Sequence, residues 1–261
     1  MKGIVWKRFS MLVAFFFCFF ALSSIAVKTA WAQQELLVSA AASLTNAFEE
    51  IGKQFEAANP GVKVVFNFGA SGALLQQIDK GAPVDVFASA DQKTMDQAKE
   101  KNLLLADTRK DFVSNGLALI VPKDSKLMVK GVKDLADPKV ARVALGNPET
   151  VPAGRYAQEV LTKAGLWETL KAKLILAENV RQALDYVGRG EVDAGFVFTT
   201  DAASAKDKVQ VAAVAEGHQP IRYPVAAVAT TKKRELAQKF IDFLLGNGGQ
   251  TILSRYGFGK P

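Results

Sequence analysis

The fold is decided by the stretch LLVSAAASLTN at residues 36–46, where a short β-rich run passes into small residues and then into a helical pattern. A second stretch, VKVVFNFGASG at 62–72, has the same order. One serine, Ser43 or Ser71, stands where each helix is expected to begin. Helix starts offer free backbone N–H groups and a positive dipole end, so two of them predict one oxyanion held from two sides. For either serine alone, an ordinary helix N-cap is the competing interpretation.

The first 32 residues have the pattern of a signal peptide. A basic start precedes an apolar run at 11–27, and Ala30-Trp31-Ala32 has the small-x-small form of a cleavage site. We therefore expect export to the periplasm, with cleavage leaving 229 of the 261 residues. An uncleaved membrane anchor is the alternative. The only cysteine, Cys18, lies in this segment, so the rest of the chain must fold without disulfides, which its length allows.

The charge balance excludes one class of partner. The whole chain has 33 basic and 26 acidic residues, a net charge of +7. Four of the basic residues and none of the acidic ones lie in the first 32, so 29 basic residues remain against 26, a net charge of +3. Because no basic stripe is interleaved with aromatic residues, nucleic acid is not an expected partner. The compact basic run at 232–234 is interpreted as a solvated helix face.

Beyond the signal peptide, short β-branched runs alternate with longer amphipathic runs, which predicts α/β sheets flanked by helices. The predicted strands are 36–40, 62–68, 84–89, 117–122, 142–145, 194–198, 209–214 and 222–229, and the predicted helices are 46–58, 73–80, 92–101, 153–164, 180–188 and 234–246. The extended runs 117–122 and 223–229 are candidates for crossings between two lobes. We therefore predict lobe 1 at 33–115 plus 225–261, lobe 2 at 116–224, and a ligand in the cleft between them.

Residues for catalysis or metal binding are sparse. The only histidine, His218, stands in a turn-like segment, and Ala73 breaks a Gly-x-Ser-x-Gly motif around Ser71. No cluster of metal ligands, phosphate loop or dinucleotide fingerprint is found, so we expect a binding protein without a cofactor or a bound metal cation; a Ser-Lys dyad remains an open alternative. Acidic residues are absent from 40–46 and 69–75. The site therefore favours a fully deprotonated dianion over phosphate, whose proton needs an acceptor.

Several further motifs lie in order along the chain: GAPVDVF at 81–87, SADQ at 89–92, GNPETVPAG at 146–154 and RYGF at 255–258. Together with 40–46, they resemble the periplasmic molybdate-binding proteins of ABC transporters. The resemblance implies the two-lobed type II periplasmic binding fold and delivery of molybdate, or also tungstate, to a membrane permease. It also implies an oxyanion cage that includes Ser43, Ser71 and the backbone N–H groups of Ala153 and Val180.

Two residues depart from the family pattern: Asn147, where relatives often have aspartate, is interpreted as a turn variation, whereas Phe198 matters because it stands where the family has a tyrosine whose hydroxyl binds the anion. We expect the anion to bind with altered affinity or selectivity. A sulfate-type binder is the nearest alternative, and a periplasmic enzyme on the same fold is a more distant one. A monomer is expected. Glu49, Glu50 and Asp91 are candidates for permease docking, although a solvated helix face explains them equally well.

Overall fold

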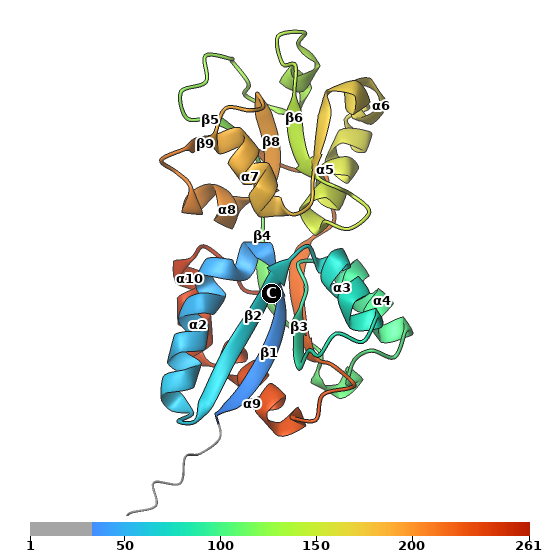
Figure 1. Cartoon of the computed structure of the whole chain (residues 1–261). Helices are drawn as coiled ribbons and strands as arrows, with labels where there is room; N and C mark the ends of the chain where they lie inside the picture. The colour runs from blue at the N-terminus through green and yellow to red at the C-terminus, as the bar shows by residue number, and fades with distance from the viewer. Residues whose placement is uncertain (1–32) are drawn as a thin grey trace, which may run out of the picture. The chain divides into compact units, whose positions relative to one another are not determined.

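The computed structural model describes residues 33–261, which contain two five-stranded sheets flanked by helices (Figure 1). The proposed signal peptide at 1–32 lies outside the described residues and stays a prediction. Two mixed sheets with helices against them are the architecture of the two-lobed type II periplasmic binding fold, so the predicted fold class is confirmed.

The first sheet has the strand order β2-β1-β3-β10-β4. Strand β1 runs parallel to β2 and β3, whereas β10 is antiparallel to β3 and β4. Its elements are β1 (Gln34–Ala41), η1 (Ala42–Leu44), α2 (Thr45–Ala58), β2 (Val62–Gly69), α3 (Ser71–Asp79), β3 (Val86–Ala88), α4 (Gln92–Glu100), η2 (Ala106–Thr108), β4 (Lys110–Asn115), β10 (Ile221–Ala227), α9 (Arg234–Leu245) and α10 (Asn247–Arg255).

The second sheet has the order β7-β6-β8-β5-β9, with β6 parallel to β7 and β8, and β5 antiparallel to β8 and β9. Helices α5, α7 and α8 pack on its strands. Its elements are β5 (Leu117–Pro122), η3 (Val132–Ala136), β6 (Val143–Gly146), α5 (Pro152–Lys163), α6 (Trp167–Leu170), η4 (Lys171–Lys173), β7 (Leu174–Ala177), α7 (Val180–Gly188), β8 (Ala194–Phe198), α8 (Thr199–Ser204) and β9 (Val209–Ala215).

Apolar side chains cover both faces of the first sheet. On one face, Phe48 and Phe55 of α2 meet Phe240 of α9 in edge-to-face contacts with ring centroids 6.1 and 5.2 Å apart. A separate cluster joins Phe87 of β3 to Met95 of α4. Burial on both sides explains why the central strands are short apolar runs without strict alternation.

The chain crosses between the sheets twice. Strand β4 ends at Asn115 and β5 begins at Leu117, so Gly116 alone joins them, and the second connection is residues 216–220 between β9 and β10. The predicted boundary after residue 224 falls inside β10, which pairs with β3 and β4 of the first sheet from Ile221 onward. The lobe division stays a prediction, and strand pairing argues for moving its second boundary to 216–220.

Sequence patterns missed the edge strands β4 and β7 and the helices α6, α8 and α10. Strand β4 reads KDFVSN, which has no clear apolar pattern, and β7 reads LILA, an apolar run of only four residues that does not distinguish a strand from a helix. Helices α6 and α8 have only four and six residues, too few for a helical repeat to stand out. Helix α10 begins at Asn247-Gly248-Gly249, a sequence that favours a turn.

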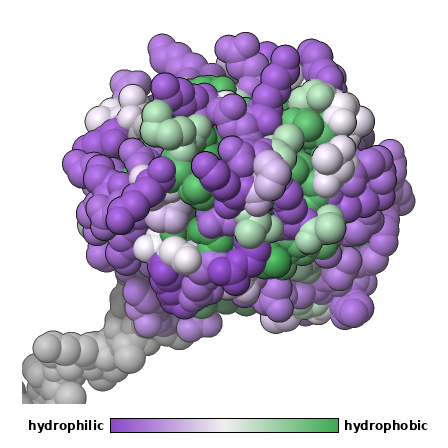
Figure 2. All heavy atoms as spheres, turned by 90° about the horizontal axis from the view of Figure 1, so that it is seen from above, coloured by the Kyte–Doolittle hydropathy of each residue, from purple (hydrophilic) through white to green (hydrophobic). Residues whose placement is uncertain are grey.

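The described surface has no broad apolar area on the face seen in Figure 2, where hydrophilic side chains surround small, separated hydrophobic areas. Within residues 33–261, every helix is too short or too polar to cross a membrane.

Candidate functional site

The two serines are brought together by the pairing of β1 with β2. These neighbouring strands are parallel, and Ala41 at the end of β1 lies opposite Gly69 at the end of β2. Ser43 follows β1 in η1, and Ser71 is the first residue of α3 after β2. Because parallel neighbours end at the same edge of a sheet, both serines lie at that edge. Their exposed fractions are 3% and 0%.

Neither serine caps its helix. Ala41 and Ala70 occupy the N-cap positions of η1 and α3, and neither helix start has a side-chain cap. The hydroxyls have other partners: Ser43 Oγ is 2.9 Å from the Tyr223 hydroxyl, and Ser71 Oγ accepts a hydrogen bond from the Ala90 N–H at 3.0 Å. The N-cap interpretation is therefore wrong for both serines.

The second lobe presents two helix starts through a matching arrangement. Strands β6 and β7 are parallel neighbours, and α5 and α7 follow them. Proline at the first position of α5 suits a helix start, and Ala153 comes next. At the start of α7, the Asn179 side chain accepts from the N–H groups of Arg181 and Gln182 and so leaves that of Val180 uncapped.

A close approach fixes the start of α5 against β6. A Cβ atom on Gly154 would lie 1.8 Å from the backbone oxygen of Gly146, so only glycine allows this helix to pack so near the strand. The Ala153 N–H thus has a defined place at the end of the second sheet.

Ser43, Ser71, Ala153, Val180 and Phe198 all line one pocket between the two sheets. Its other lining residues are Ala41, Ala42, Gly69, Ala70, Ala90, Val151 and Pro152, so the lining contains no titratable side chain among the described residues. The cavity has a volume of only about 10 Å³, whereas sites for organic ligands enclose ~300–1,000 Å³. The pocket therefore suits a small ion rather than an organic molecule.

Phe198 closes one wall of this pocket at the end of β8, with 1% of its surface exposed. Its ring packs against Tyr156 and Tyr223, with centroids 6.4 and 5.6 Å away. The phenylalanine that replaces the tyrosine expected from the family resemblance thus forms part of the pocket wall.

Sequence patterns did not predict two hydrogen-bonded bridges that join the lobes beside the pocket. The Gly72 N–H donates to the Thr150 carbonyl at 2.9 Å. Arg155 donates to Asp91 Oδ2 from Nε at 2.9 Å and from Nη2 at 2.6 Å, and Nη2 also reaches Thr94 Oγ1 at 2.7 Å. Asp91 is 3% exposed, so it is not the exposed docking residue that the sequence suggested. These bonds hold the two lobes in a closed arrangement.

Buried ionisable groups lie behind the pocket. Burial raises the pKa of Asp201 in α8 to about 6, although Arg181 Nε, 2.6 Å from Asp201 Oδ1, opposes the shift. Burial also raises the pKa of Tyr223 well above its ordinary value, so its hydroxyl keeps its hydrogen at neutral pH.

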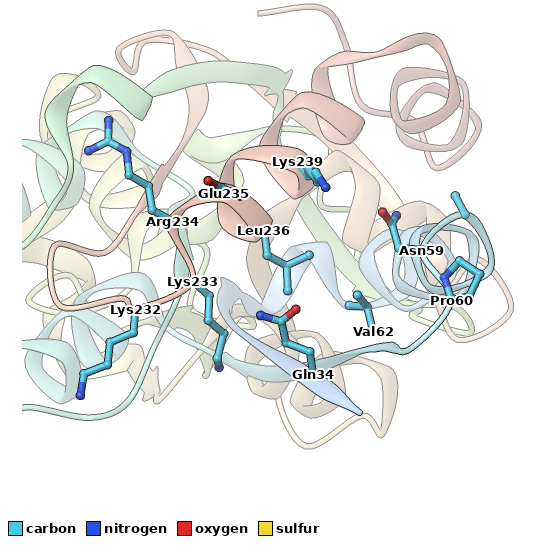
Figure 3. Close-up of a pocket in the computed structure, with 11 residues that line it drawn as sticks. Gln34, Asn59, Pro60, Val62, Lys232, Lys233, Arg234, Glu235, Leu236 and Lys239 are labelled. Carbon is cyan, nitrogen blue, oxygen red and sulfur yellow. The ribbon is translucent and has the colours of Figure 1, made fainter. Parts of the chain in front are cut away.

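A larger hollow lies elsewhere in the first lobe, lined by the basic run at 232–234 and by Lys239, Asn59 and Gln34 (Figure 3). Its basic side chains point in different directions. Lys233 Nζ lies 3.0 Å from Asp85 Oδ2, and Arg234 pairs with Asp107. Because these charges do not converge and two of them are neutralised, this hollow is a weaker anion site. Residues 33–261 contain no cluster of His, Cys, Asp and Glu that could hold a metal ion.

Comparison with known proteins gives concordant matches. A family model of bacterial extracellular solute-binding proteins matches residues 36–259. The molybdate-binding protein ModA of Escherichia coli is 41% identical over 91% of this chain and 94% of its own length. ModA of Haemophilus influenzae is 37% identical over 87% and 91%. The structure of the periplasmic molybdate-binding protein of Azotobacter vinelandii aligns with a TM-score of 0.76 at 26% identity, covering 87% of this chain and 99% of that one.

Proposed function

Because the chain belongs to the bacterial extracellular solute-binding proteins, we propose that it captures molybdate between its lobes in the periplasm and delivers it to the membrane permease of an ABC importer. One observation carries the proposal: the five residues that sequence reasoning assigned to the anion line one small, uncharged pocket. Tungstate, with the same charge and shape, is proposed as a second ligand.

Neutral donors would hold the anion. The two serine hydroxyls and the backbone N–H groups at the starts of α3, α5 and α7 surround the pocket, and the helix dipoles there favour negative charge. A hydrogen bond to a charged group contributes about 1.5–3 kcal/mol, so about five to eight of them would support micromolar or tighter binding after the costs of association.

Closure couples binding to delivery. Gly72 and Arg155 make bonds that exist only when the lobes meet, and the anion's donors also come from both lobes. An anion that contacts both lobes stabilises the closed state by its differential affinity for it. A permease that recognises the closed state would thereby distinguish loaded from unloaded protein.

Sulfate is the nearest alternative ligand, because it has the same charge and tetrahedral shape at a smaller size. An enzyme on this fold has less support, because the described pocket lining has no acid, base or histidine and the compared relatives are solute-binding proteins.

Calorimetric titration of the purified protein against molybdate, tungstate, sulfate and phosphate tests the proposal. We expect micromolar or tighter binding of molybdate and tungstate, weaker binding of sulfate and none of phosphate. Ser71→Ala should weaken molybdate binding by about tenfold or more through loss of one charge-assisted bond. Tight binding of sulfate with none of molybdate would overturn the assignment.

Delivery is tested separately in a bacterium that lacks its own molybdate-binding protein but keeps the permease that this chain serves. Expression of the wild type should restore molybdenum uptake, and Ser71→Ala should restore less at limiting molybdate. Equal uptake with and without the protein would contradict its role in delivery.

A further inference from the structure

Tyr223 lies directly behind the pocket without being part of its lining. It belongs to β10, is fully buried, and places its hydroxyl 2.9 Å from Ser43 Oγ. Its ring is held in edge-to-face contacts by Phe112, Phe198 and Phe258. The position of the hydroxyl is therefore set by packing, and its only side-chain partners among the described residues are Ser43 and Asn115.

Asn115 determines which way these hydrogen bonds run. It ends β4 at the first crossing, and its Oδ1 accepts from the Gly116 N–H and from Thr199 Oγ1, both at 2.9 Å. A backbone N–H can only donate, so the atom facing Gly116 must be the oxygen. The amide nitrogen then faces Tyr223 at 3.1 Å and Thr200 Oγ1 at 2.9 Å, and donates to both.

The direction passes along the chain to the pocket. Because the Tyr223 oxygen accepts from Asn115, its own hydrogen is left for Ser43 Oγ. Ser43 then accepts from within the protein, and its hydroxyl hydrogen is free for the pocket. Ser71 is in the same state, because its Oγ accepts from the Ala90 N–H. Both serine hydroxyls are thus directed as donors toward a ligand.

We propose that Asn115 and Tyr223 are positioning residues that determine specificity: through Ser43 they make the pocket a set of donors that selects fully deprotonated dianions. This inference rests on the proposed function. A hydrogenphosphate ion needs an acceptor for its proton, and the lining offers no carboxylate; its two hydroxyls, on Ser43 and Ser71, each already accept one hydrogen bond within the protein and present their hydrogens to the pocket. Molybdate and sulfate need no acceptor. Asn115 and Tyr223 therefore select ligands by protonation state, because they favour an anion that carries no proton. The size of the pocket separates molybdate from sulfate.

A double-mutant cycle tests whether Tyr223 acts through Ser43. Tyr223→Phe removes only the hydroxyl and should weaken molybdate binding by about tenfold, as expected for loss of one oriented hydrogen bond. In the Ser43→Ala background the same change should cost less than about twofold, because the hydroxyl that it orients is gone. Tyr156→Phe is the matched control: its ring also contacts Phe198, but no hydrogen bond joins it to the serines, so affinity should stay within about twofold.

Selectivity is the readout that a purely structural role would not change. In Tyr223→Phe the Ser43 hydroxyl is no longer fixed as a donor and can rotate to accept a hydrogen bond from hydrogenphosphate, so the ratio of molybdate to phosphate affinity should fall, whereas Tyr156→Phe should keep it. Asn115→Asp places an acceptor against the Tyr223 hydroxyl, which would reverse the bonds and turn the Ser43 hydrogen away from the pocket. It should therefore weaken molybdate binding more than Tyr223→Phe does.

The possible failures are distinguishable. If the wild type does not bind molybdate, the proposed function fails. If the wild type binds but Tyr223→Phe keeps both affinity and the molybdate-to-phosphate ratio, the positioning role is wrong. A loss in Tyr223→Phe that persists undiminished in the Ser43→Ala background would also overturn it, because Tyr223 would then act independently of Ser43.

Discussion

Gly72→Ala should weaken molybdate binding by hindering closure of the lobes, without lowering the thermal stability of the protein free of ligand. Gly72 is the second residue of α3, and a Cβ atom there would lie 2.7 Å from the Thr150 carbonyl oxygen and 2.8 Å from the Thr150 Cα. Both are backbone atoms of the opposite lobe, which side-chain rotation cannot move aside. The lobes would have to stay several tenths of an ångström further apart, and the 2.9 Å hydrogen bond from the Gly72 N–H would weaken.

The expected effect has two parts. Overpacking of this kind costs about 1–3 kcal/mol, and the hydrogen bond contributes about 1 kcal/mol. A total of about 2–4 kcal/mol corresponds to molybdate binding that is weaker by about 30- to 1,000-fold. Without ligand the lobes are free to part, and alanine favours the helix by up to about 1 kcal/mol over glycine. The midpoint of thermal unfolding without molybdate should therefore stay the same or rise.

Calorimetric titration and thermal unfolding without ligand together check this prediction. Gly131→Ala is the control, because its φ is −171° and no atom lies within 4 Å of the added Cβ, so both measurements should match the wild type. Molybdate affinity in Gly72→Ala within about threefold of the wild type would refute the reasoning, because the closed arrangement would not be the state that binds.

Three further predictions concern the pocket and its surroundings. Arg155→Gln leaves Asp91, whose side chain is 5% exposed, without its charged partner in the closed state, so calorimetry should show about 5- to 100-fold weaker molybdate binding. Arg189→Gln is the control, because Arg189 is exposed, and it should leave the molybdate affinity unchanged. Phe198→Tyr adds a donor to the pocket wall and should change the molybdate affinity by about fivefold or more; an unchanged binding profile would argue against a role for position 198. Asp201 has a folded pKa raised to about 6, so its favourable contribution is complete below about pH 4 and is lost as pH rises through 6. Asp201→Asn should flatten that decline in unfolding free energy, by about 3 kcal/mol at most, and equal pH profiles for the two proteins would contradict the raised pKa.

Local patterns in the sequence determined much of the pocket. A β-rich run, small residues and a helical pattern stand together at Ser43 and at Ser71, so both junctions are visible without a structure. The starts of α5 and α7 are also marked locally, by Pro152 and by the capping residue Asn179. The roles of Ala153 and Val180 as backbone donors came only from the family resemblance, because a backbone N–H leaves no side-chain signal. Their part in holding the anion stays a proposal.

Only the tertiary structure decided how the pocket is closed and oriented. Strands β4 and β7 lie at sheet edges; β4 has no clear apolar pattern and β7 is an apolar run of only four residues, so strand pairing reveals them. Tyr223 is 180 residues from Ser43, and Arg155 is 64 residues from Asp91. A hydrogen bond between such distant residues requires no local pattern at either end, because the fold supplies the proximity. The sequence thus marked the strand-to-helix junctions that line the pocket, whereas the packing of β10 and the meeting of the two lobes decided how those junctions are held.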